Sequence, residues 1–516
     1  MNSTNKIINV FLVIAVTLGV ICLVFIYLPD TLSSHKLLPK ENTTPESFYL
    51  LPPIEKNVQK EEPKIKIIGT YAKFTPKKLK VKREDVESKT QGWLTVPDGI
   101  KDEFNFWLKI YSKYSSDEIV LHDTKYMHVI YGVVSISDIV NNEWLTDEQK
   151  KTETKKRIEA SKDLIRDTLT LLDKNPTTEE LTPKERRIRF LFSRIDEPKK
   201  YKNALGGNRL RAQVGQRDKF AEAIKLSGEH FDKIEKIFKN YNLPKELTRL
   251  IFVESMFVIE AQSFVGALGL WQFMENTGKI YLNMNSYVDE RLDPYKAAHA
   301  AAQLLLDNYE YVGMSWPLAI NAYNAGKGRL RDARNRLGTS DISTIIKKYD
   351  HPAYGFAARN FFPEFLAAVE AYKNYPLYFG EIEKLPPLEY DIVELNYHIM
   401  LPEVLPLTQI DPETIKKLNP ALSNHVMTGE LYLPKGFKLR IPKGKSDLFL
   451  ALCARAAKSH LGEFYHRVYK GDNLQNLSRL FGITPEDIKI ANNLKGSALR
   501  PGQLLVIPVG DSTTEN

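Results

Sequence analysis

Apolar residues recur every three or four positions between residues 217 and 375, the spacing of helices that each bury one face. The pattern predicts one helix from Asp218 to Asn240 and a second that begins after Pro244. A third helix is predicted to begin at Asp293, with this residue as the N-cap and a proline in the first turn, and to end at Gly313. This part of the chain is therefore expected to be helical throughout.

A continuous apolar run without a charged residue, Val10 to Leu28, is long enough to cover a bilayer core, which takes about 20 residues. A secretory signal would show a shorter apolar stretch followed by small residues, whereas residues 25–28 are large and lead into Pro29. We interpret the run as an uncleaved membrane anchor. A cleaved signal peptide is the alternative.

The rest of the chain divides by composition and patterning. Residues 30–85 are rich in Pro, Lys, Glu, Ser and Thr, a composition that favours a disordered tether. Beyond it, "DEFNFWLKIYSKYSS" predicts an amphipathic helix and "TKYMHVIYGVV" a strand. The predicted parts are an anchor (1–29), a disordered linker (30–85), a helical or mixed region of no assignable role (86–205), a helical domain (206–380) and two small modules (388–443 and 464–509).

The last module has the pattern strand, helix, helix, strand. Tyr465 to Tyr469 alternates like a strand, Asp472 or Asn473 caps a helix, Thr484 caps a second helix, and Leu504 to Ile507 forms the closing strand. Its ending, "LLVIP", is echoed by "FKLRIP" at the end of 388–443, so the earlier module is interpreted as a degenerate copy, and its binding of the same ligand is left open. The predicted fold class is mainly α, with small α+β modules and an N-terminal transmembrane helix.

Composition and charge limit the kinds of site that this chain is expected to contain. The 516 residues are 43% hydrophobic and 26% charged, an ordinary globular content that suffices for several domains. The net charge of +8, from 72 Lys and Arg against 64 Asp and Glu, favours approach to polyanions in general and selects none. Cys22 and Cys453 provide no disulfide framework, and the histidines lack metal-ligand spacing, so we predict neither metal nor cofactor.

Glu254 occupies a position where the helix pattern calls for an apolar side chain. Stepping by threes and fours from Leu247 through Ile251 leads to Glu254 and then to Phe257. Burial disfavours the charged form of a carboxyl and raises its pKa, which is what a general acid working near neutral pH requires. The alternative is a structural glutamate, bonded to buried backbone groups or paired with a residue such as Arg249.

The segment 261–274 that follows adds groups suited to a sugar. Two glycines allow close approach of the backbone, Ser263 and Gln272 offer directional hydrogen bonds, and Trp271 or Met274 could form an apolar floor for a ring face. Taken one at a time, the serine is equally well a cap, the glutamine a solvated side chain and the tryptophan a core residue.

Three motifs in order, "ES.F", "A.S..GA.GL.QFM" and "AYNAG", resemble the soluble-lytic-transglycosylase type of lysozyme-like domain found in murein-cleaving enzymes. The resemblance spans residues 245–375. It implies that Glu254 is the sole catalytic acid and base. It also implies that the bound glycan is contacted by Ser263, Gln272, Met274, Tyr323 and Asn324.

The resemblance implies a reaction as well. Glu254 would protonate the oxygen between N-acetylmuramic acid and N-acetylglucosamine and would then accept the proton of the muramoyl C6 hydroxyl, leaving a 1,6-anhydro ring and consuming no water. Two alternatives stay open: a hydrolytic muramidase on the same fold, and a wall-binding scaffold without catalysis. The implied partner is peptidoglycan, with no nucleic acid; protein partners cannot be named.

The sequence departs from the family near the end of this domain. Many members carry a glutamate-containing stretch that ends in Tyr-Val-Pro, whereas this chain has "GFAARNFFPEF", with Ala357, Phe361 and Pro363 at the matching places. The change removes a carboxylate and a hydroxyl. We expect Arg359 and Asn360 to supply the missing polar contacts.

The carboxy-terminal pattern "V..GD.L..L...F......I...N.L.....L..GQ.L.IP" resembles a LysM module. This resemblance implies binding of glycans that contain N-acetylglucosamine, by two loops that carry Gly471, Asp472, Asn473 and Asn493. The whole arrangement resembles membrane-bound lytic murein transglycosylases. We therefore expect anchoring in an inner membrane with the catalytic part facing the periplasm, or secretion to the periplasm if the apolar run is cleaved.

Overall fold

A computed structural model describes residues 92–459, 464–469 and 471–508. These residues belong to two compact units, with residues 92–459 in the first and the described residues from 464 onward in the second. The predicted anchor and the tether at 30–85 lie outside the described residues. Within the described ranges, no helix combines the length and the apolar content needed to cross a bilayer.

The described chain is mainly helical, as the sequence predicts, with three small sheets. The amino-terminal part of the first unit consists of η1 (Asp98–Ile100), α3 (Lys101–Ser112), β1 (Glu118–Asp123), β2 (Ile130–Ser135), α4 (Ser137–Val140), α5 (Asp147–Lys174), α6 (Pro183–Leu191), α7 (Lys200–Leu205) and β3 (Leu210–Val214). The three strands form an antiparallel sheet in the order β2-β1-β3.

The predicted strand over "TKYMHVIYGVV" begins later than expected, at Ile130. The Asp123 carboxylate explains the delay, because its Oδ1 accepts the backbone N–H groups of Lys125 and Tyr126 at 2.8 Å and 2.9 Å. Such a bond turns the chain away from extended structure. The helix predicted over "DEFNFWLKIYSKYSS" is present as α3.

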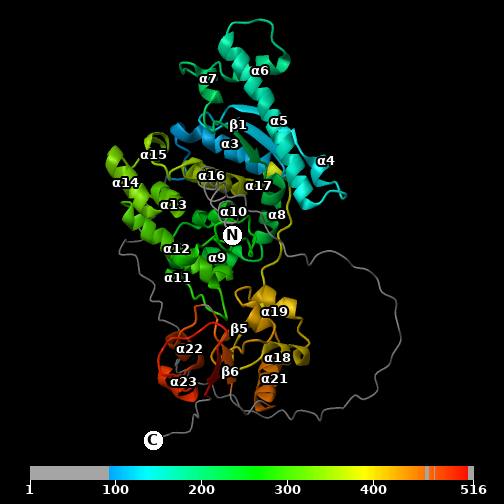
Figure 1. Ribbon diagram of the computed structural model, residues 1–516, viewed down its shortest axis with the longest axis vertical. Coiled ribbons are helices and arrows are strands. Elements are labelled where there is room, and N and C mark those ends of the chain that lie inside the picture. The colour runs from blue at the N-terminus through cyan, green and yellow to red at the C-terminus, as the bar shows by residue number, and fades with distance from the viewer. Residues whose placement is uncertain (1–91, 460–463, 470, 509–516) are drawn as a thin grey trace, which may run out of the picture. The chain divides into compact units, whose positions relative to one another are not determined.

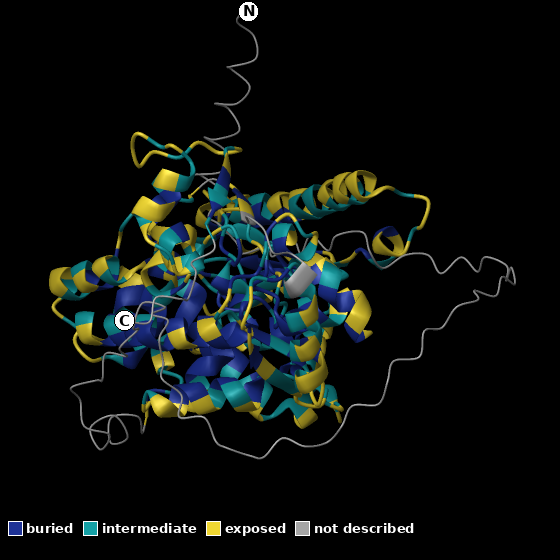
Figure 2. Ribbon diagram, turned by 90° about the horizontal axis from the view of Figure 1, so that it is seen from below, coloured by how far each residue is buried: buried dark blue, intermediate teal, exposed yellow. Residues whose placement is uncertain are grey.

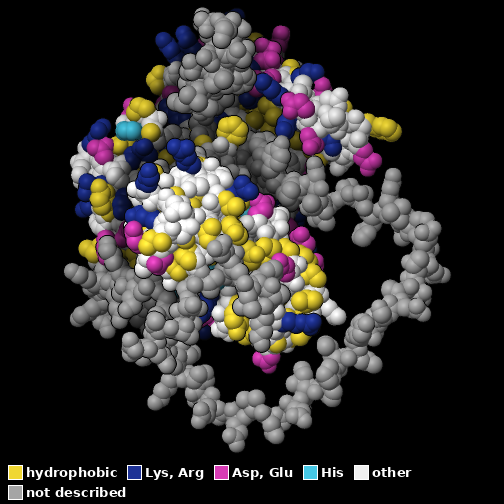
Figure 3. All heavy atoms as spheres, turned by 60° about the horizontal axis from the view of Figure 1, so that its bottom comes forward, with side chains coloured by type: hydrophobic (Ala, Val, Ile, Leu, Met, Phe, Trp, Pro, Cys, Tyr) yellow, Lys and Arg dark blue, Asp and Glu magenta, His cyan; other side chains and the backbone are white. Residues whose placement is uncertain are grey.

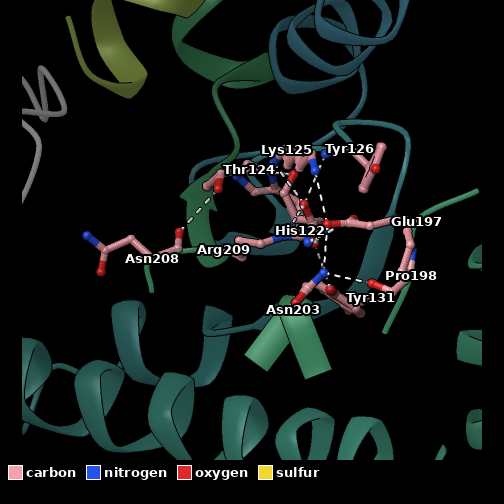
Figure 4. Close-up of polar contacts among 11 residues, drawn as sticks. His122, Thr124, Lys125, Tyr126, Tyr131, Glu197, Pro198, Asn203, Asn208 and Arg209 are labelled. Carbon is pink, nitrogen blue, oxygen red and sulfur yellow. Dashed lines mark hydrogen bonds and ion pairs between the residues drawn. The ribbon is translucent and has the colours of Figure 1, made fainter. Parts of the chain in front are cut away.

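A buried network centred on Asp123 holds the sheet to the α6–α7 connection (Figure 4). The Asp123 side chain has no exposed surface, and its Oδ2 accepts bonds from Arg209 Nη2 at 2.7 Å and Tyr131 Oη at 3.2 Å. Arg209 also pairs with Glu197 at 3.3 Å, and Glu197 accepts a bond from Asn203 Nδ2 at 2.9 Å. Each buried charge thus has partners, which is the condition for its burial to be tolerated.

The two faces of this sheet pack differently. Ile119 and Leu121 point into a core with the inner faces of α5 and α6, while Val120, between them in sequence, joins the core shared by α3 and the helices that follow the sheet. The alternation follows from the period of two along a strand. The amino-terminal part is therefore joined to the helical domain through a common core.

The helical domain contains α8 (Arg217–Ser227), α9 (Phe231–Asn240), η2 (Lys245–Arg249), α10 (Leu250–Glu254), α11 (Glu275–Tyr281), η3 (Glu290–Leu292), α12 (Pro294–Tyr311), α13 (Trp316–Ala325), α14 (Lys327–Leu337), α15 (Ile342–Lys348), α16 (Phe356–Lys373) and α17 (Tyr375–Phe379). The prediction for α12 is confirmed, because Asp293 accepts the N–H groups of Tyr295 and Lys296 and Gly313 follows with a φ of 87°. Figure 2 shows buried residues gathered on the inner faces of the helices.

The prediction of one continuous helix from Asp218 to Asn240 is wrong. The chain forms two helices, α8 and α9, with a break at Gly228. A Cβ at Gly228 would lie 2.0 Å from the backbone oxygen of Leu385, so a distant segment passes directly against the break. Helical periodicity persists through the break because both helices bury the same side, and periodicity alone therefore missed it.

The remainder of the first unit contains β4 (Tyr390–Glu394), α18 (Leu401–Thr408), α19 (Pro412–Leu418), α20 (Asn424–Met427), β5 (Lys438–Pro442) and α21 (Ser446–Ser459). Strands β4 and β5 pair antiparallel. This module lies against the helical domain: Ser423 N donates to Tyr287 O at 2.8 Å, and Arg440 forms a largely buried ion pair with Asp293 at 2.8 Å.

The second unit is a small α+β module, with β6 (Phe464–Arg467), α22 (Leu474–Phe481), α23 (Pro485–Ala491) and β7 (Leu504–Ile507). Its strands pair antiparallel, and both predicted caps are confirmed: Asn473 accepts the N–H of Asn476, and Thr484 forms a capping box with Asp487. The core consists of Val468, Leu474, Leu477, Ile488, Leu505 and Ile507.

Candidate active site

Glu254 is the last residue of α10, and its side chain turns towards the interior. The residue is 7% exposed, and its carboxyl makes no hydrogen bond or ion pair with the residues that the structure describes. Burial and, after it, the charge of Glu364 together raise the pKa of this carboxyl to about 8. A carboxyl in this setting retains its proton at neutral pH.

The ion pair considered as an alternative is not formed. Arg249 instead contacts Glu235 and the backbone oxygen of Lys245, and its guanidinium lies over the rings of Phe231 and Tyr372. Its charge is thus paired with another carboxylate, and no cation in the described chain favours the charged form of Glu254.

The backbone after Glu254 reverses through a turn that few residues adopt. Met256 and Phe257 have φ of 48° and 63°, in the left-handed region. Ser255 stabilises the turn, because its hydroxyl donates to Leu270 O at 2.9 Å. Non-glycine residues in this region cost about 1 kcal/mol or more each, and such strain is concentrated at functional sites. The turn brings the segment 261–274 back beside the end of α10.

Ser263 and Gln272, both predicted to contact glycan, hold this segment together. Ser263 Oγ accepts the backbone N–H of Ala267 at 2.9 Å. Gln272 Nε2 donates to Ala261 O at 2.8 Å and to Gly269 O at 2.9 Å, while Gln272 itself has a φ of 48°. Both side chains are half-buried. The serine hydroxyl can still donate, and the glutamine carbonyl oxygen has no bond in the described chain.

The prediction that Trp271 could form an apolar floor for a sugar ring is wrong. Its side chain has no exposed surface and is stacked on Phe238, with ring centroids 5.3 Å apart. Met274, the other candidate, is 43% exposed at the start of α11. The tryptophan therefore supports the segment from the core side, and only the methionine is available to a ligand.

Tyr323 connects the third motif to this segment. Its hydroxyl donates to Trp271 O at 2.8 Å, and its ring is parallel to that of Phe361 at 6.5 Å. Burial and the charge of Glu254 raise the pKa of Tyr323 well above its usual value, so the phenol stays neutral. The neighbouring Asn324 is exposed.

Replacing Tyr323 by phenylalanine removes this one hydrogen bond and keeps the ring. We expect a loss of about 1 kcal/mol in unfolding free energy, the usual net value of such a bond. The activity of the site should fall about tenfold, because the segment beside Glu254 loses an anchor. Chemical denaturation measures the first effect and the rate of the catalysed reaction the second; a change in stability without a change in activity would contradict the link to the site.

The expected role of Arg359 and Asn360 is not supported by their contacts. Arg359 donates to Tyr349 O at 2.7 Å and to Ile346 O, and so caps the end of α15. Asn360 accepts a bond from Trp107 Nε1 at 2.9 Å and donates to Phe356 O at 2.9 Å. Both side chains thus brace helices, and the polar atoms that make these bonds are used there.

Glu364 was missed by sequence reasoning. It lies on α16, its carboxyl acts electrostatically on Glu254, and burial raises its own pKa to about 8. The same signal that identified Glu254 was present: Phe361, Phe365 and Ala368 are buried on the face that Glu364 continues.

In the carboxy-terminal module, the four predicted glycan contacts differ in availability. Gly471, Asn473 and Asn493 are exposed, the glycine with a φ of 102°. Asp472 is used internally, because its Oδ2 accepts the N–H of Tyr469 at 2.8 Å and contacts His466 Nε2 at 2.8 Å. The aspartate therefore shapes the loop that carries the other residues.

Charge is mixed over the surface. On the face shown in Figure 3, Lys and Arg side chains are interspersed with Asp and Glu and with hydrophobic side chains. Among the residues described, no group of three or more His, Cys, Asp or Glu side chains is placed to hold a metal ion.

Two segments match known families. Residues 233–346 match the family described as Transglycosylase SLT domain, and residues 466–508 match the LysM domain. The chain is also 27% identical over 292 residues to the membrane-bound lytic murein transglycosylase D of Escherichia coli, in strain K12 and in strain CFT073 of serotype O6:H1. The match covers 53% of this chain, which spans 62% of the length of these relatives.

Two solved structures show partial similarity. An inactive mutant of the lytic transglycosylase Slt from Pseudomonas aeruginosa is 22% identical over 31% of this chain and 25% of its own, with a TM-score of 0.23. The 70 kDa soluble lytic transglycosylase of Escherichia coli is 26% identical over 29% of this chain and 25% of its own, also with a TM-score of 0.23.

Proposed function

We propose that this chain, which carries a transglycosylase SLT domain and a LysM domain, is a lytic transglycosylase of peptidoglycan. The proposed reaction cleaves the β-1,4 bond between N-acetylmuramic acid and N-acetylglucosamine and leaves a 1,6-anhydro end. The observation that carries the proposal is Glu254: a carboxyl of raised pKa, without a charge partner in the described chain, inside the matched domain.

In this mechanism Glu254 first acts as an acid. It enters the reaction protonated, because burial disfavours its charge, and it gives its proton to the glycosidic oxygen as the bond breaks. The carboxylate that remains is unstable in this setting, so it is a strong base for the proton of the muramoyl C6 hydroxyl. The hydroxyl oxygen closes on C1, and Glu254 recovers its proton without a water molecule.

We assign the positioning of the glycan to the side chains around Glu254. Met274 and Asn324 are exposed, so they can touch a sugar directly, the first through its apolar chain and the second through its amide. Ser263 and Gln272 each keep one polar function beyond the bonds that hold their segment. Tyr323 fixes the segment on which Gln272 lies.

The other parts of the chain would concentrate the enzyme at its substrate. In the proposed arrangement the LysM module binds N-acetylglucosamine-containing strands through Gly471, Asn473 and Asn493, and the residues before 86 anchor and tether the protein on the periplasmic side of an inner membrane. The similarity to membrane-bound lytic murein transglycosylase D of Escherichia coli supports this placement. A second weak site on a tether raises the effective concentration at the wall.

The products test the reaction. Digestion of purified murein by the full chain should release muropeptides with anhydro ends, whose mass is lower by one water than that of the hydrolytic product. Mass spectrometry of the digest measures this difference directly. Products that carry reducing ends from the first time points would contradict the proposal.

Hydrolysis is a second candidate, favoured by one observation. Glu364 places a second carboxyl close enough to act on Glu254, and a pair of carboxyls is what hydrolytic glycosidases use to activate water. The same digest separates the candidates, because a muramidase would add the mass of a water molecule to each new end.

A further inference from the structure

We propose that Glu364 is a positioning residue that controls the protonation of Glu254, and that Tyr111, from the amino-terminal part of the chain, holds it in place. The inference rests on the proposed function and adds a specific role for helix α3. The sequence predicted that helix but assigned it no chemistry.

Helices α3 and α16 lie side by side, as Figure 1 shows, and two hydrogen bonds join them, one buried and one partly buried. Trp107 Nε1 donates to Asn360 Oδ1 at 2.9 Å, and Tyr111 Oη donates to Glu364 Oε1 at 2.9 Å. Each pair of partners is displaced from the other by four residues, one turn of helix. The two bonds therefore form a short ladder that fixes α16 along its axis and rotates Glu364 to face α3.

Tyr111 is suited to hold a carboxylate here. Its side chain is fully buried in the shared core, with its ring against Trp107 at 6.3 Å and Phe220 at 5.0 Å, so the hydroxyl cannot turn freely away. A phenol donates one hydrogen bond to an ionised carboxyl and favours its charged form. Tyr111 accordingly lowers the pKa of Glu364, which burial raises.

Helix α10, which ends at Glu254, packs against α16, and the charge of Glu364 acts on the Glu254 carboxyl. Two carboxyls that interact in this way cannot both ionise easily. Glu364 has a donor and Glu254 has none in the described chain, so Glu364 loses its proton first. The resulting charge opposes ionisation of Glu254. Tyr111 thus decides which carboxyl of the pair carries the charge, and the acid that reaches the glycan keeps its proton.

The other groups around the pair are neutral or directed elsewhere. Tyr323, from α13, faces Glu254 and stays a neutral phenol. Arg249, from η2, is paired with Glu235, and Arg359, from α16 itself, is bonded to backbone oxygens of α15 and the residue after it. None of these groups places a cation against Glu364, so its charge, once formed, acts on Glu254 without a neighbouring countercharge.

The test is the pH dependence of kcat/KM for murein digestion by the full chain. In Glu364→Gln, Glu254 no longer faces a charge, so its pKa falls and the alkaline limb of the profile moves to lower pH. We expect the activity at pH 8, relative to that at pH 6, to drop about three- to tenfold, since one unit of pKa is a factor of ten. Tyr111→Phe should move the limb in the same direction, because Glu364 then keeps its own proton.

Matched variants separate this role from a structural one. Glu370→Gln changes a second glutamate of α16 that also accepts a tyrosine hydroxyl, that of Tyr378 at 3.0 Å, and its profile should keep the parent shape. Glu364→Asp retains a carboxyl, so its alkaline limb should lie between that of Glu364→Gln and that of the parent. Trp107→Phe breaks the other rung of the ladder and should leave the limb in place.

An equal loss of activity at every pH in Glu364→Gln, or an unmoved limb in a folded and active variant, would overturn the inference and leave Glu364 a structural residue. Those outcomes are distinct from failure of the proposed function itself. That failure would show as a Glu254→Gln protein that still cleaves murein, whatever the profile of the Glu364 variants.

Discussion

Replacing Glu254 by glutamine lowers the rate of murein cleavage by about 10³-fold or more, the range in which general acid and base catalysis contributes. Glutamine has the shape of the protonated acid but has no proton to give and cannot accept one. Because a single carboxyl performs both proton transfers in the proposed mechanism, one substitution removes both. The measurement is the rate of release of soluble anhydro-muropeptides from purified murein.

The same substitution should stabilise the fold at alkaline pH. The pKa of Glu254 is raised from 4.5 to about 8, so the folded state binds a proton that the unfolded state has released. The contribution of this carboxyl to the free energy of unfolding is therefore full below pH 4.5. It decreases as the pH rises from 4.5 and is lost as the pH rises through 8, because the unfolded state binds fewer protons than the folded state in that interval. Glutamine has no such dependence. The melting temperature of the variant should exceed that of the parent at pH 8 and match it at pH 4.

Glu260→Gln is the control for both effects. Glu260 is exposed six residues further along the chain, so its loss of charge should change neither rate nor alkaline stability by more than a small factor. If the Glu254→Gln protein cleared murein as fast as the parent, the chain would be a wall-binding scaffold, and the carboxyl would have no part in catalysis.

Gly269→Ala is expected to have the second largest effect. Gly269 has a φ of 86°, and a Cβ at this position would lie 1.9 Å from the backbone oxygen of Arg291. Backbone cannot yield as a flexible side chain can. We expect a loss of about 3 kcal/mol or more in unfolding free energy, from the left-handed backbone and the overlap together.

Activity should fall with it. Gly269 accepts bonds from both the backbone and the side chain of Gln272, so displacement of this glycine shifts the segment beside Glu254. A displacement of about 1 Å in such a segment can cost about 10²-fold in rate. Chemical denaturation and the murein assay measure the two losses on one preparation.

Gly266→Ala is the matched control. Gly266 has the same φ of 86°, yet nothing lies within 4 Å of the Cβ that alanine would add. The Gly266→Ala protein should lose only the part of the unfolding free energy that comes from the left-handed backbone, about 1 kcal/mol, and should keep most of its activity. Equal effects at the two glycines would contradict the explanation by close approach to Arg291.

Local patterns predicted the elements of this chain because the forces that select them are local. Asp293 and Thr484 bond to the first turns of the helices that follow them, and each was recognised from its own few neighbours. Glu254 was recognised from the helical period in the same way. Periodicity failed at two points: a distant segment at Leu385 passes against the helix break at Gly228, and the neighbouring Asp123 carboxylate turns the chain and delays the strand that follows.

The sequence by itself determined the mainly helical class, the order of elements in the carboxy-terminal module and the presence of an acid on a buried helical face. Tertiary structure decided which groups surround that acid. Trp271 lies in the core, and Arg359 bonds to the end of α15. Glu364 acts on Glu254 and accepts a hydrogen bond from Tyr111. The reason is physical. A helical period says which side of a helix is buried, but partners separated by 253 residues meet only when α3 and α16 pack together.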